Sequence, residues 1–193
     1  MNRIRMFCWV LLVIQSSVWA ERKRFVFLEK QMGADFRIVL YAEDAKLARA
    51  AANAAFDEVE RLNAIFSDYD AESELSLLSE ISGGGKKCPV SPDLWTVLSA
   101  SQRLSTQTDG AFDITVGPCV RLWRIARFRK TLPTADKIAR ARKATGYRKI
   151  LLSPKAQKVQ LKGTNMILDL GGIAKGYAAD KMMKILKGKG MQS

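Results

Sequence analysis

The chain of 193 residues contains no histidine and only three cysteines. The absence of histidine excludes Ser-His-Asp triads, histidine metal sites and histidine general acids among these residues. A metal bound here would have to be a hard cation held by oxygen atoms. Hydrophobic residues make up 48% of the chain and charged residues 26%, which is typical of a globular protein rather than a disordered one. The length suffices for one domain with its own core.

A hydrophobic run long enough to span a bilayer is also missing from the N-terminus. The run Met6–Ile14 is too short. It follows Arg3 and Arg5 and leads into a polar stretch ending at Ala20, which is the pattern of a secretory signal peptide. An uncleaved anchor is the alternative. We expect residues 1–20 to be a signal peptide cleaved after Ala20, which predicts an exported, periplasmic protein with no stable membrane anchor.

Two cysteines remain after the predicted leader, Cys88 and Cys119. Export would place them in an oxidising compartment, where they could pair. Two cysteines are a weak signal for a disulfide. The apolar neighbours of Cys119 favour a small buried hydrophobic side chain instead.

The charge is unevenly distributed. Residues 21–120 carry 11 basic and 16 acidic groups, whereas residues 121–193 carry 19 basic and 3 acidic groups. A basic half suits an anionic partner. The stretch Arg121–Lys130 mixes aromatic residues with arginines, but it lacks a recognisable nucleic-acid-binding module, and we expect no nucleic acid as partner. A basic surface that only aids solubility is the alternative.

The periodicity of apolar residues predicts strands, then helices, then strands and a last helix. Phe112–Ile125 is apolar, with an interruption at Gly117-Pro118. This order indicates an α+β fold rather than regular βαβ alternation. The expected elements are strands at Arg24–Lys30 and Phe36–Tyr41, helices at Glu43–Phe66, Leu75–Ile81, Ser91–Thr106 and Thr134–Thr145, strands at Lys149–Leu152, Lys158–Leu161 and Met166–Leu170, and a helix at Ile173–Leu186.

The segment LDLGGIAKGYAAD, residues 168–180, joins a predicted strand to a predicted helix. Its two glycines allow a close approach of backbone N–H groups to a ligand, and a helix N-terminus favours an anion. Lys175 in the first turn opposes the helix dipole, which makes more sense with a phosphate or carboxylate nearby. The pattern is neither a P-loop nor GxGxxG. A phosphate-binding turn and a merely tight connection both fit these residues.

A second segment, DGAFDITVGPCVRLW at residues 109–123, places Phe112 beside Asp113. An aromatic ring next to a carboxylate suits a ligand site. Alternatively, Phe112 is a core residue and Asp113 caps the following helix.

Four segments in order resemble the ApbE family, which are FAD:protein FMN transferases. They are QMGADFRIVL, FSDYDAESELSLLSE, DGAFDITVGPCVRLW and LDLGGIAKGYAAD. The resemblance implies an ApbE-like, T-fold-like mixed sheet with packed helices. It makes residues 21–193 the N-terminal part of a single FMN transferase domain.

The resemblance also implies an activity: Mg²⁺-dependent transfer of FMN from FAD to a threonine hydroxyl of a target flavoprotein subunit, with release of AMP. It assigns the Gly172 carbonyl to Mg²⁺ and leaves the catalytic residue unknown. The residues that the resemblance places at FAD are Met32, Tyr69, Ala111, Phe112, Asp113, Asp169 and Lys175.

The sequence departs from the family at its C-terminal end. The resemblance implies that members continue for well over a hundred residues and carry further Mg²⁺ ligands and a histidine motif there. We therefore expect a C-terminally incomplete chain that binds FAD weakly and transfers FMN poorly. An exported protein that binds or hydrolyses FAD, or an inactive truncated fragment, is the alternative.

Overall fold

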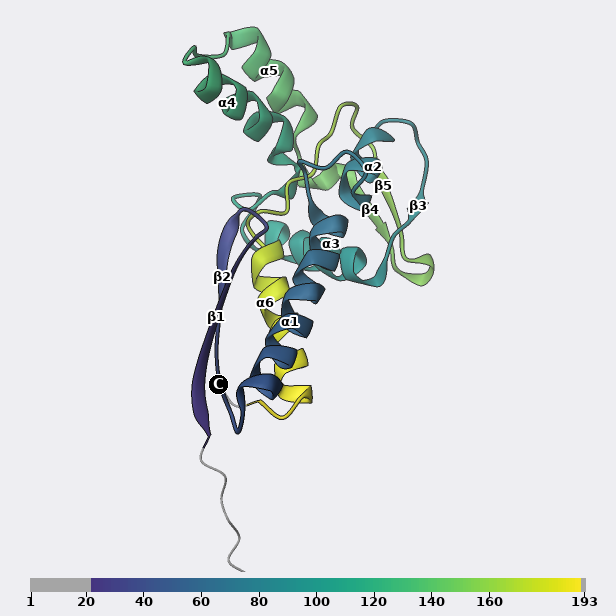
Figure 1. Ribbon diagram of the computed structural model, residues 1–193. Helices are drawn as coiled ribbons and strands as arrows, with labels where there is room; N and C mark the ends of the chain where they lie inside the picture. Colours follow the sequence, from purple (N-terminus) through teal and green to yellow (C-terminus); the bar gives the residue numbers. More distant parts are fainter. Residues whose placement is uncertain (1–21, 192–193) are drawn as a thin grey trace, which may run out of the picture.

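The computed structural model describes residues 22–191 (Figure 1), and the predicted α+β class is confirmed. The predicted leader, residues 1–20, lies outside the described residues. The strands are β1 Lys23–Gln31, β2 Ala34–Ala42, β3 Cys88–Pro89, β4 Ile150–Ser153 and β5 Lys158–Leu161. The helices are α1 Ala45–Phe66, α2 Glu74–Glu80, α3 Pro92–Gln107, α4 Gly117–Arg129, α5 Ala135–Ala144 and α6 Ala174–Gly188, with short 3₁₀ helices at Ile114–Val116, Tyr147–Lys149 and Pro154–Ala156.

Strands β1 and β2 form an antiparallel hairpin, as predicted. Its two turn residues, Met32 and Gly33, have φ angles of 49° and 68°. Two positive φ values match the twist of a tight hairpin. Glycine adopts this conformation freely, whereas a methionine there is uncommon. The inner face of β2 buries Ile38 and Leu40 against the core.

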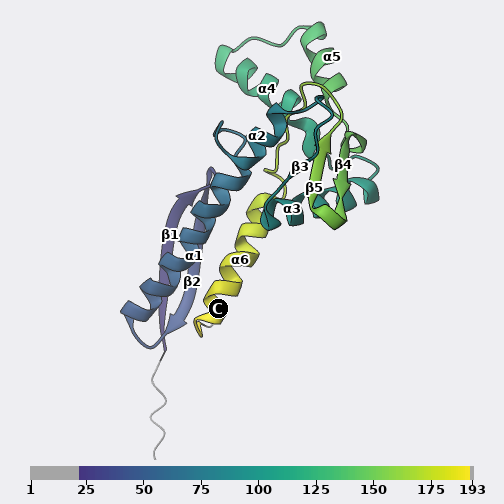
Figure 2. The same cartoon turned by 90° about the vertical axis from the view of Figure 1, so that its right-hand side faces the viewer.

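Helix α1 runs along the elongated half of the molecule (Figures 1 and 2). Asp44 caps it by accepting a hydrogen bond from the N–H of Leu47 at 2.9 Å. Its buried face is rich in alanine, which allows neighbouring elements to approach closely; these residues are Ala48, Ala51, Ala52 and Ala55. The β1–β2 hairpin and α6 both pack against α1 (Figures 1 and 2).

A second, three-stranded antiparallel sheet has the order β3-β5-β4. The prediction missed β3, because two residues that include a proline show no strand alternation. Val159 and Leu161 of β5 are buried in the core. Cys88 of β3 and Cys119 of α4 are free cysteines, so the possible disulfide is not formed.

The prediction of a strand at Met166–Leu170 is wrong. The segment alternates buried and half-buried side chains, as a strand would, but it is paired with no strand of the described chain. Three of its N–H groups donate instead to Ser82 Oγ, Ser79 Oγ and Ile114 O, at 3.1, 3.2 and 2.8 Å. The alternation predicted the burial of these side chains correctly. It could not indicate that serine hydroxyls, rather than a neighbouring strand, would accept hydrogen bonds from the backbone N–H groups.

Gly117-Pro118, expected to interrupt an apolar segment, is where α4 begins. Proline is tolerated in the first turn of a helix because the N–H that it lacks would have no partner within the helix. A Cβ on Gly117 would lie 2.4 Å from the carbonyl oxygen of Ile167, so only glycine lets the Met166–Leu170 segment lie this close. Helices α4 and α5 form a hairpin that projects from the rest of the chain (Figures 1 and 2). Within residues 22–191, no helix combines the length and apolarity that a membrane span requires.

Candidate functional site

Arg124 of α4 joins two of the segments singled out in the sequence. One guanidinium nitrogen lies 2.5 Å from Asp68 Oδ2, and the other lies 3.5 Å from Asp169 Oδ2. The guanidinium carbon also lies 4.1 Å from the centre of the Tyr69 ring, within range of a cation–π interaction. We call these four residues the Arg124 cluster. It brings together the loop after α1, helix α4 and the segment before α6.

The Arg124 side chain is one-third exposed, whereas those of Asp68 and Asp169 are 14% and 13% exposed. Burial lowers the pKa of Arg124, but the hydrogen bond to Asp68 and the charges of its neighbours outweigh burial, so the pKa is raised overall. Arg124 therefore remains a cation at any physiological pH. Its charge is available to orient both carboxylates.

A cavity of about 650 Å³ adjoins the Arg124 cluster. Among the residues lining it are Asp68, Tyr69 and Arg124 of the cluster, together with Gly117 and Arg121 of α4. Tyr69 is 79% exposed, so its ring offers an aromatic face to a ligand. The lining is mixed, because the charged side chains of Asp68, Glu80, Arg121 and Arg124 stand beside apolar residues of the segment 166–168.

The Gly171-Gly172 turn directly follows Leu170 and, before it, Asp169 of this cluster. The side chains of Asp169 and Lys175 hold it in place. Asp169 Oδ1 accepts a hydrogen bond from the N–H of Gly171 at 2.8 Å, and Lys175 Nζ donates to the carbonyl oxygen of Gly171 at 2.9 Å. Helix α6 has no side-chain N-cap. An exposed lysine thus lies over the turn, at the positive end of a helix, which is an arrangement suited to an anion.

Phe112 is half-buried and packs against the same turn. A Cβ built on Gly172 would lie 3.1 Å from Phe112 Cε2, so the ring and the glycine backbone are in close contact. Ala111, next to Phe112, is exposed. The structure therefore places the DGAFD and LDLGG segments side by side at this point.

Asp113 has a structural role. Its Oδ1 accepts hydrogen bonds from the N–H and the hydroxyl of Thr115 at 2.8 and 2.7 Å, and its Oδ2 accepts one from the N–H of Tyr147 at 2.9 Å. The cap role considered from the sequence is confirmed for the 3₁₀ helix that follows. Contact between Asp113 and FAD stays a prediction.

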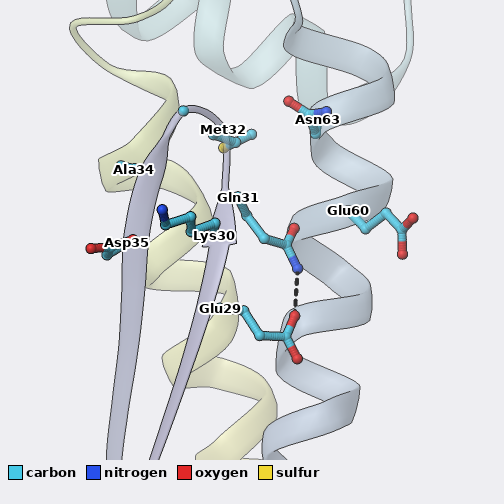
Figure 3. A pocket seen from close by; sticks show the side chains of 9 residues that line it. Glu29, Lys30, Gln31, Met32, Ala34, Asp35, Glu60 and Asn63 are labelled. Carbon is cyan, nitrogen blue, oxygen red and sulfur yellow. Dashed lines mark hydrogen bonds between the residues drawn. The ribbon is translucent and has the colours of Figure 1, made fainter.

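Met32 lies at a separate cavity, of about 810 Å³, beneath the β1–β2 turn (Figure 3). This cavity is lined by hairpin residues together with Glu60 and Asn63 of α1, and none of the other predicted site residues lines it. Gln31 donates to Glu29 Oε2 at 3.1 Å and to the carbonyl oxygen of Phe56 at 3.2 Å, which fixes the lower wall. Of the predicted site residues, Tyr69 alone lines the cavity beside the Arg124 cluster, and Met32 lies at the other cavity. The remaining predicted residues line neither of these two cavities; they are Ala111, Phe112, Asp113, Asp169, Gly172 and Lys175.

The donor set for a metal is incomplete in the described part of the chain. No three cysteine or carboxylate side chains of residues 22–191 come together as metal ligands. Near Gly172, the carboxylate of Asp169 is already engaged by Gly171 and Arg124. Mg²⁺ keeps several waters and commonly binds through one or two carboxylates and substrate phosphates, so these residues would supply only part of its ligands.

The residues that the sequence reasoning missed are Asp68, Arg121 and Arg124. Asp68 belongs to the quoted SDYD segment, and both arginines lie on α4 three positions apart, so they share one face. The signal was present as two basic residues at helical spacing directly after DGAFDITVGP. The role of these two arginines could not be inferred without knowing which acidic residues lie next to α4 in the folded chain.

A second charged cluster lies where α1, α3 and α6 meet. Asp93 accepts hydrogen bonds from Arg61 Nη2 and the Tyr177 hydroxyl, both at 2.6 Å, and pairs with Lys181 Nζ at 2.7 Å. Burial raises the pKa of the Asp93 carboxyl, but its bonds with Lys181, Tyr177 and Arg61 outweigh burial and hold that pKa well below its usual range. We call this the Asp93 cluster. It lines neither of the cavities described above.

The sequence is similar to a known protein family and to curated relatives. A family model described as "ApbE family" matches residues 32–193. A protein from Haemophilus influenzae named FAD:protein FMN transferase is 31% identical over 166 residues, covering 82% of this chain and 47% of its own length. A Klebsiella pneumoniae protein of the same name is 30% identical over 156 residues, covering 81% of this chain and 48% of its own length. The chain thus spans about half the length of the curated relatives it matches.

Solved structures show the same similarity. The flavin transferase ApbE from Vibrio cholerae superposes with a TM-score of 0.81 at 26% identity, covering 89% of this chain and 56% of that one. The ApbE protein from Thermotoga maritima gives a TM-score of 0.78 at 28% identity, covering 86% and 53%. The fold inferred from the sequence resemblance is therefore confirmed.

Proposed function

This chain belongs to the ApbE family, and we propose that it carries the FAD-binding part of an FAD:protein FMN transferase. The observation that carries the proposal is the meeting of three motif segments at one place. The loop with Asp68 and Tyr69 meets α4 and the Asp169 segment through Arg124, beside a cavity of about 650 Å³. The names of the curated relatives and of the Vibrio cholerae structure support the flavin as ligand.

We assign the following roles to the residues of the site. The exposed Tyr69 ring stacks on the flavin, and Phe112 with Ala111 forms the apolar wall beside the glycine turn. Lys175, at the start of α6, neutralises a phosphate. Arg124 keeps Asp169 in place, so that its carboxylate accepts a hydrogen bond from the cofactor. Met32 and Asp113 stay assigned to FAD as predictions.

The proposed reaction is a phosphoryl-group transfer. The threonine Oγ of a target protein attacks the phosphorus on the FMN side of FAD, the bond from that phosphorus to the bridging pyrophosphate oxygen breaks, AMP leaves, and the hydroxyl proton is lost. We propose that Mg²⁺ is required, with the Gly172 carbonyl oxygen as one ligand among others not provided by the described residues. When bound, the metal supplies neutralisation of the pyrophosphate charge. No residue is assigned as catalytic base.

We also propose that the protein works after export, in the periplasm, on a flavoprotein subunit with an acceptor threonine. The proposal rests on the leader-like pattern of residues 1–20. Determination of the N-terminal residue of the protein recovered from periplasmic extract tests it. A mature chain beginning at Glu21 is expected; a chain recovered with Met1 from the cytoplasm would contradict it.

The activity is tested with the 193-residue chain and with any longer in-frame product of the same gene. Each is incubated with FAD, Mg²⁺ and a threonine-containing target, and the target is analysed by mass spectrometry while AMP is quantified. For the longer product, covalent FMN on the threonine together with an equal amount of AMP is expected, whereas the 193-residue chain is expected to transfer little FMN. AMP without modification of the target would instead identify an FAD hydrolase.

FAD binding is tested separately by flavin fluorescence with and without Mg²⁺. Lys175→Ala and Asp169→Ala are expected to weaken binding about tenfold each, because each loses one charged contact of about 1.4 kcal/mol. Lys184→Ala, on the same helix, is the matched control. If neither substitution changes FAD binding, the assignment of the site fails.

A further inference from the structure

The projecting α4–α5 hairpin concentrates the positive charge of the chain. Residues 117–145 contain nine basic residues and one acidic residue, which is a net charge of +8 out of +13 for the whole chain. Of these nine, Arg124 pairs with Asp68 and Asp169, and the other eight are exposed. So much like charge on one small element repels itself, and it is stabilised when an anionic surface is bound.

The same hairpin exposes large apolar side chains. Phe128 is 89% exposed and Leu132 is 79% exposed, the first on the last turn of α4 and the second in the link to α5. Both therefore lie at the end of the hairpin that joins the two helices. Ile125 is 44% exposed one turn before Phe128. Apolar groups gathered at the tip of a projecting element mark a surface that is covered when the protein functions.

The charged and apolar groups share one face of α4. Arg121, Ile125 and Phe128 stand at spacings of four and three residues, which places them in one row along the helix. A cavity of about 500 Å³ lies between α4, α5 and residues 164–167, extending from Ile125 towards the base of the hairpin. Arg121, Lys137, Arg140 and Lys143 supply its cations, and Leu122 and Ile125 are among its apolar lining residues. The pattern combines sites for an anionic headgroup with apolar groups that suit the adjacent hydrocarbon.

The apolar chemistry distinguishes a lipid from a nucleic acid. Ile125 and Leu132 are aliphatic and cannot stack on bases as aromatic rings do. The two aromatic residues of α4, Trp123 and Phe128, are five positions apart and so point about 140° away from each other around the helix. They form no common stacking platform. A basic element with apolar side chains at its tip is instead typical of segments that lie in the interface of an anionic membrane.

We propose that the α4–α5 hairpin docks on the surface of a membrane rich in anionic phospholipid. Phe128 and Leu132 enter the interface between headgroups and acyl chains. The cationic cavity between α4 and α5 binds a phosphate headgroup. Since the Arg124 cluster lies on α4 as well, the candidate site is then held at a fixed distance from the membrane surface.

The test is flotation of the full 193-residue chain with vesicles of phosphatidylglycerol and phosphatidylcholine, compared with vesicles of phosphatidylcholine alone. Phe128→Ala/Leu132→Ala is expected to lower the partition onto the anionic vesicles about tenfold, and Arg140→Gln/Lys143→Gln is expected to lower it to a similar extent. The matched controls are Val26→Ala/Leu28→Ala, exposed apolar residues of β1, and Lys155→Gln/Lys158→Gln, exposed basic residues of the β4–β5 connection and of β5. Neither control is expected to change the partition.

Hydrogen–deuterium exchange locates the contact, because any contribution of residues 1–20 would appear in different peptides. Protection of peptides within residues 121–133 by the anionic vesicles is expected. Protection confined to other segments would overturn the proposal, as would equal partition of the Phe128→Ala/Leu132→Ala variant. Binding of duplex DNA as tightly as of anionic vesicles, unaffected by that variant, would identify a nucleic-acid surface and would also overturn it.

Discussion

The Arg124 cluster and the Asp93 cluster contain the same kinds of side chain but different surroundings. Each joins arginine, aspartate and tyrosine side chains through polar contacts of 2.5 to 3.5 Å, to which the Arg124 cluster adds a cation–π contact of 4.1 Å. In the Asp93 cluster the tyrosine hydroxyl and two cations all point at one carboxylate, which is thereby satisfied. In the Arg124 cluster one cation serves two carboxylates, and the tyrosine ring remains 79% exposed beside a cavity. An exposed aromatic ring beside a cavity, rather than charge alone, distinguishes the candidate site from a cluster that only stabilises the fold.

The largest effect is expected for the Asp93 cluster. Asp93→Asn leaves Arg61 and Lys181 without their shared anion and should lower the free energy of unfolding by about 2 to 3 kcal/mol, since both cations are partly exposed and screened. Thermal unfolding should show a fall in Tm of about 4 to 12 °C. Asp57→Asn, exposed on α1, is the control with no expected change. A Tm equal to that of the wild type would remove the distinction between the clusters.

The next effect concerns the support beneath the site. Gly117→Ala places a methyl group against the backbone of Ile167 and should cost about 1 to 2 kcal/mol, because backbone must move. The same movement should displace Asp169 and weaken FAD binding. Gly176→Ala is the contrasting variant, since a Cβ there meets nothing within 4 Å and alanine favours a helix. Urea unfolding of both variants measures the difference; equal stability would refute the close contact.

A smaller effect is expected at the candidate site itself. Arg124→Gln releases Asp68 and Asp169 and removes a positive charge, so FAD affinity should fall about tenfold. The free energy of unfolding should change by less than about 1 kcal/mol, as for other partly exposed ion pairs. Arg127→Gln, one turn further along α4 and exposed, tests the charge alone. An equal loss of FAD affinity in both variants would mean that Arg124 acts only through its positive charge and not by holding Asp68 and Asp169.

The smallest effect is a pH dependence. The pKa of Asp93 is lower in the folded chain than its unfolded value of about 3.9, so its stabilising contribution is complete above about pH 4 and is lost as the pH falls towards the folded value. The stability difference between wild type and Asp93→Asn should therefore shrink by about 1 kcal/mol on acidification below pH 4. Urea unfolding at several pH values checks this. A constant difference would contradict the assigned charge state of Asp93.

Much of the fold could be predicted from the sequence, because local patterns determine it. The β1–β2 hairpin follows from alternation around Met32-Gly33, and α1 follows from its apolar periodicity. The Met166–Leu170 segment could not be predicted, since its partners are serine hydroxyls of α2 and the loop after it. Whether an alternating segment joins a sheet depends on distant residues that periodicity does not report.

The candidate site was predicted in part. Tyr69, Phe112 and Asp169 came from the motifs, and the structure places them around α4 and the glycine turn. Arg124 was missed because its importance comes from two acidic residues 56 and 45 positions away, which only folding brings within reach. Asp113 could be assigned from sequence either to a cap or to a ligand, and the geometry resolves the cap alone.

The bonding of the Met166–Leu170 segment has a consequence for how this site can change during evolution. In a sheet, the position of a carboxylate is fixed by a ladder of backbone bonds that no single substitution can adjust. Here Leu168, next to Asp169, is held by the hydroxyl of Ser79, and Met166 by that of Ser82. The N–H of Asp169 itself donates to the backbone carbonyl of Ile114, and that bond does not depend on any side chain. The placement of this carboxylate therefore combines one backbone bond with neighbouring bonds to serine hydroxyls, and only the latter can be changed by a single substitution.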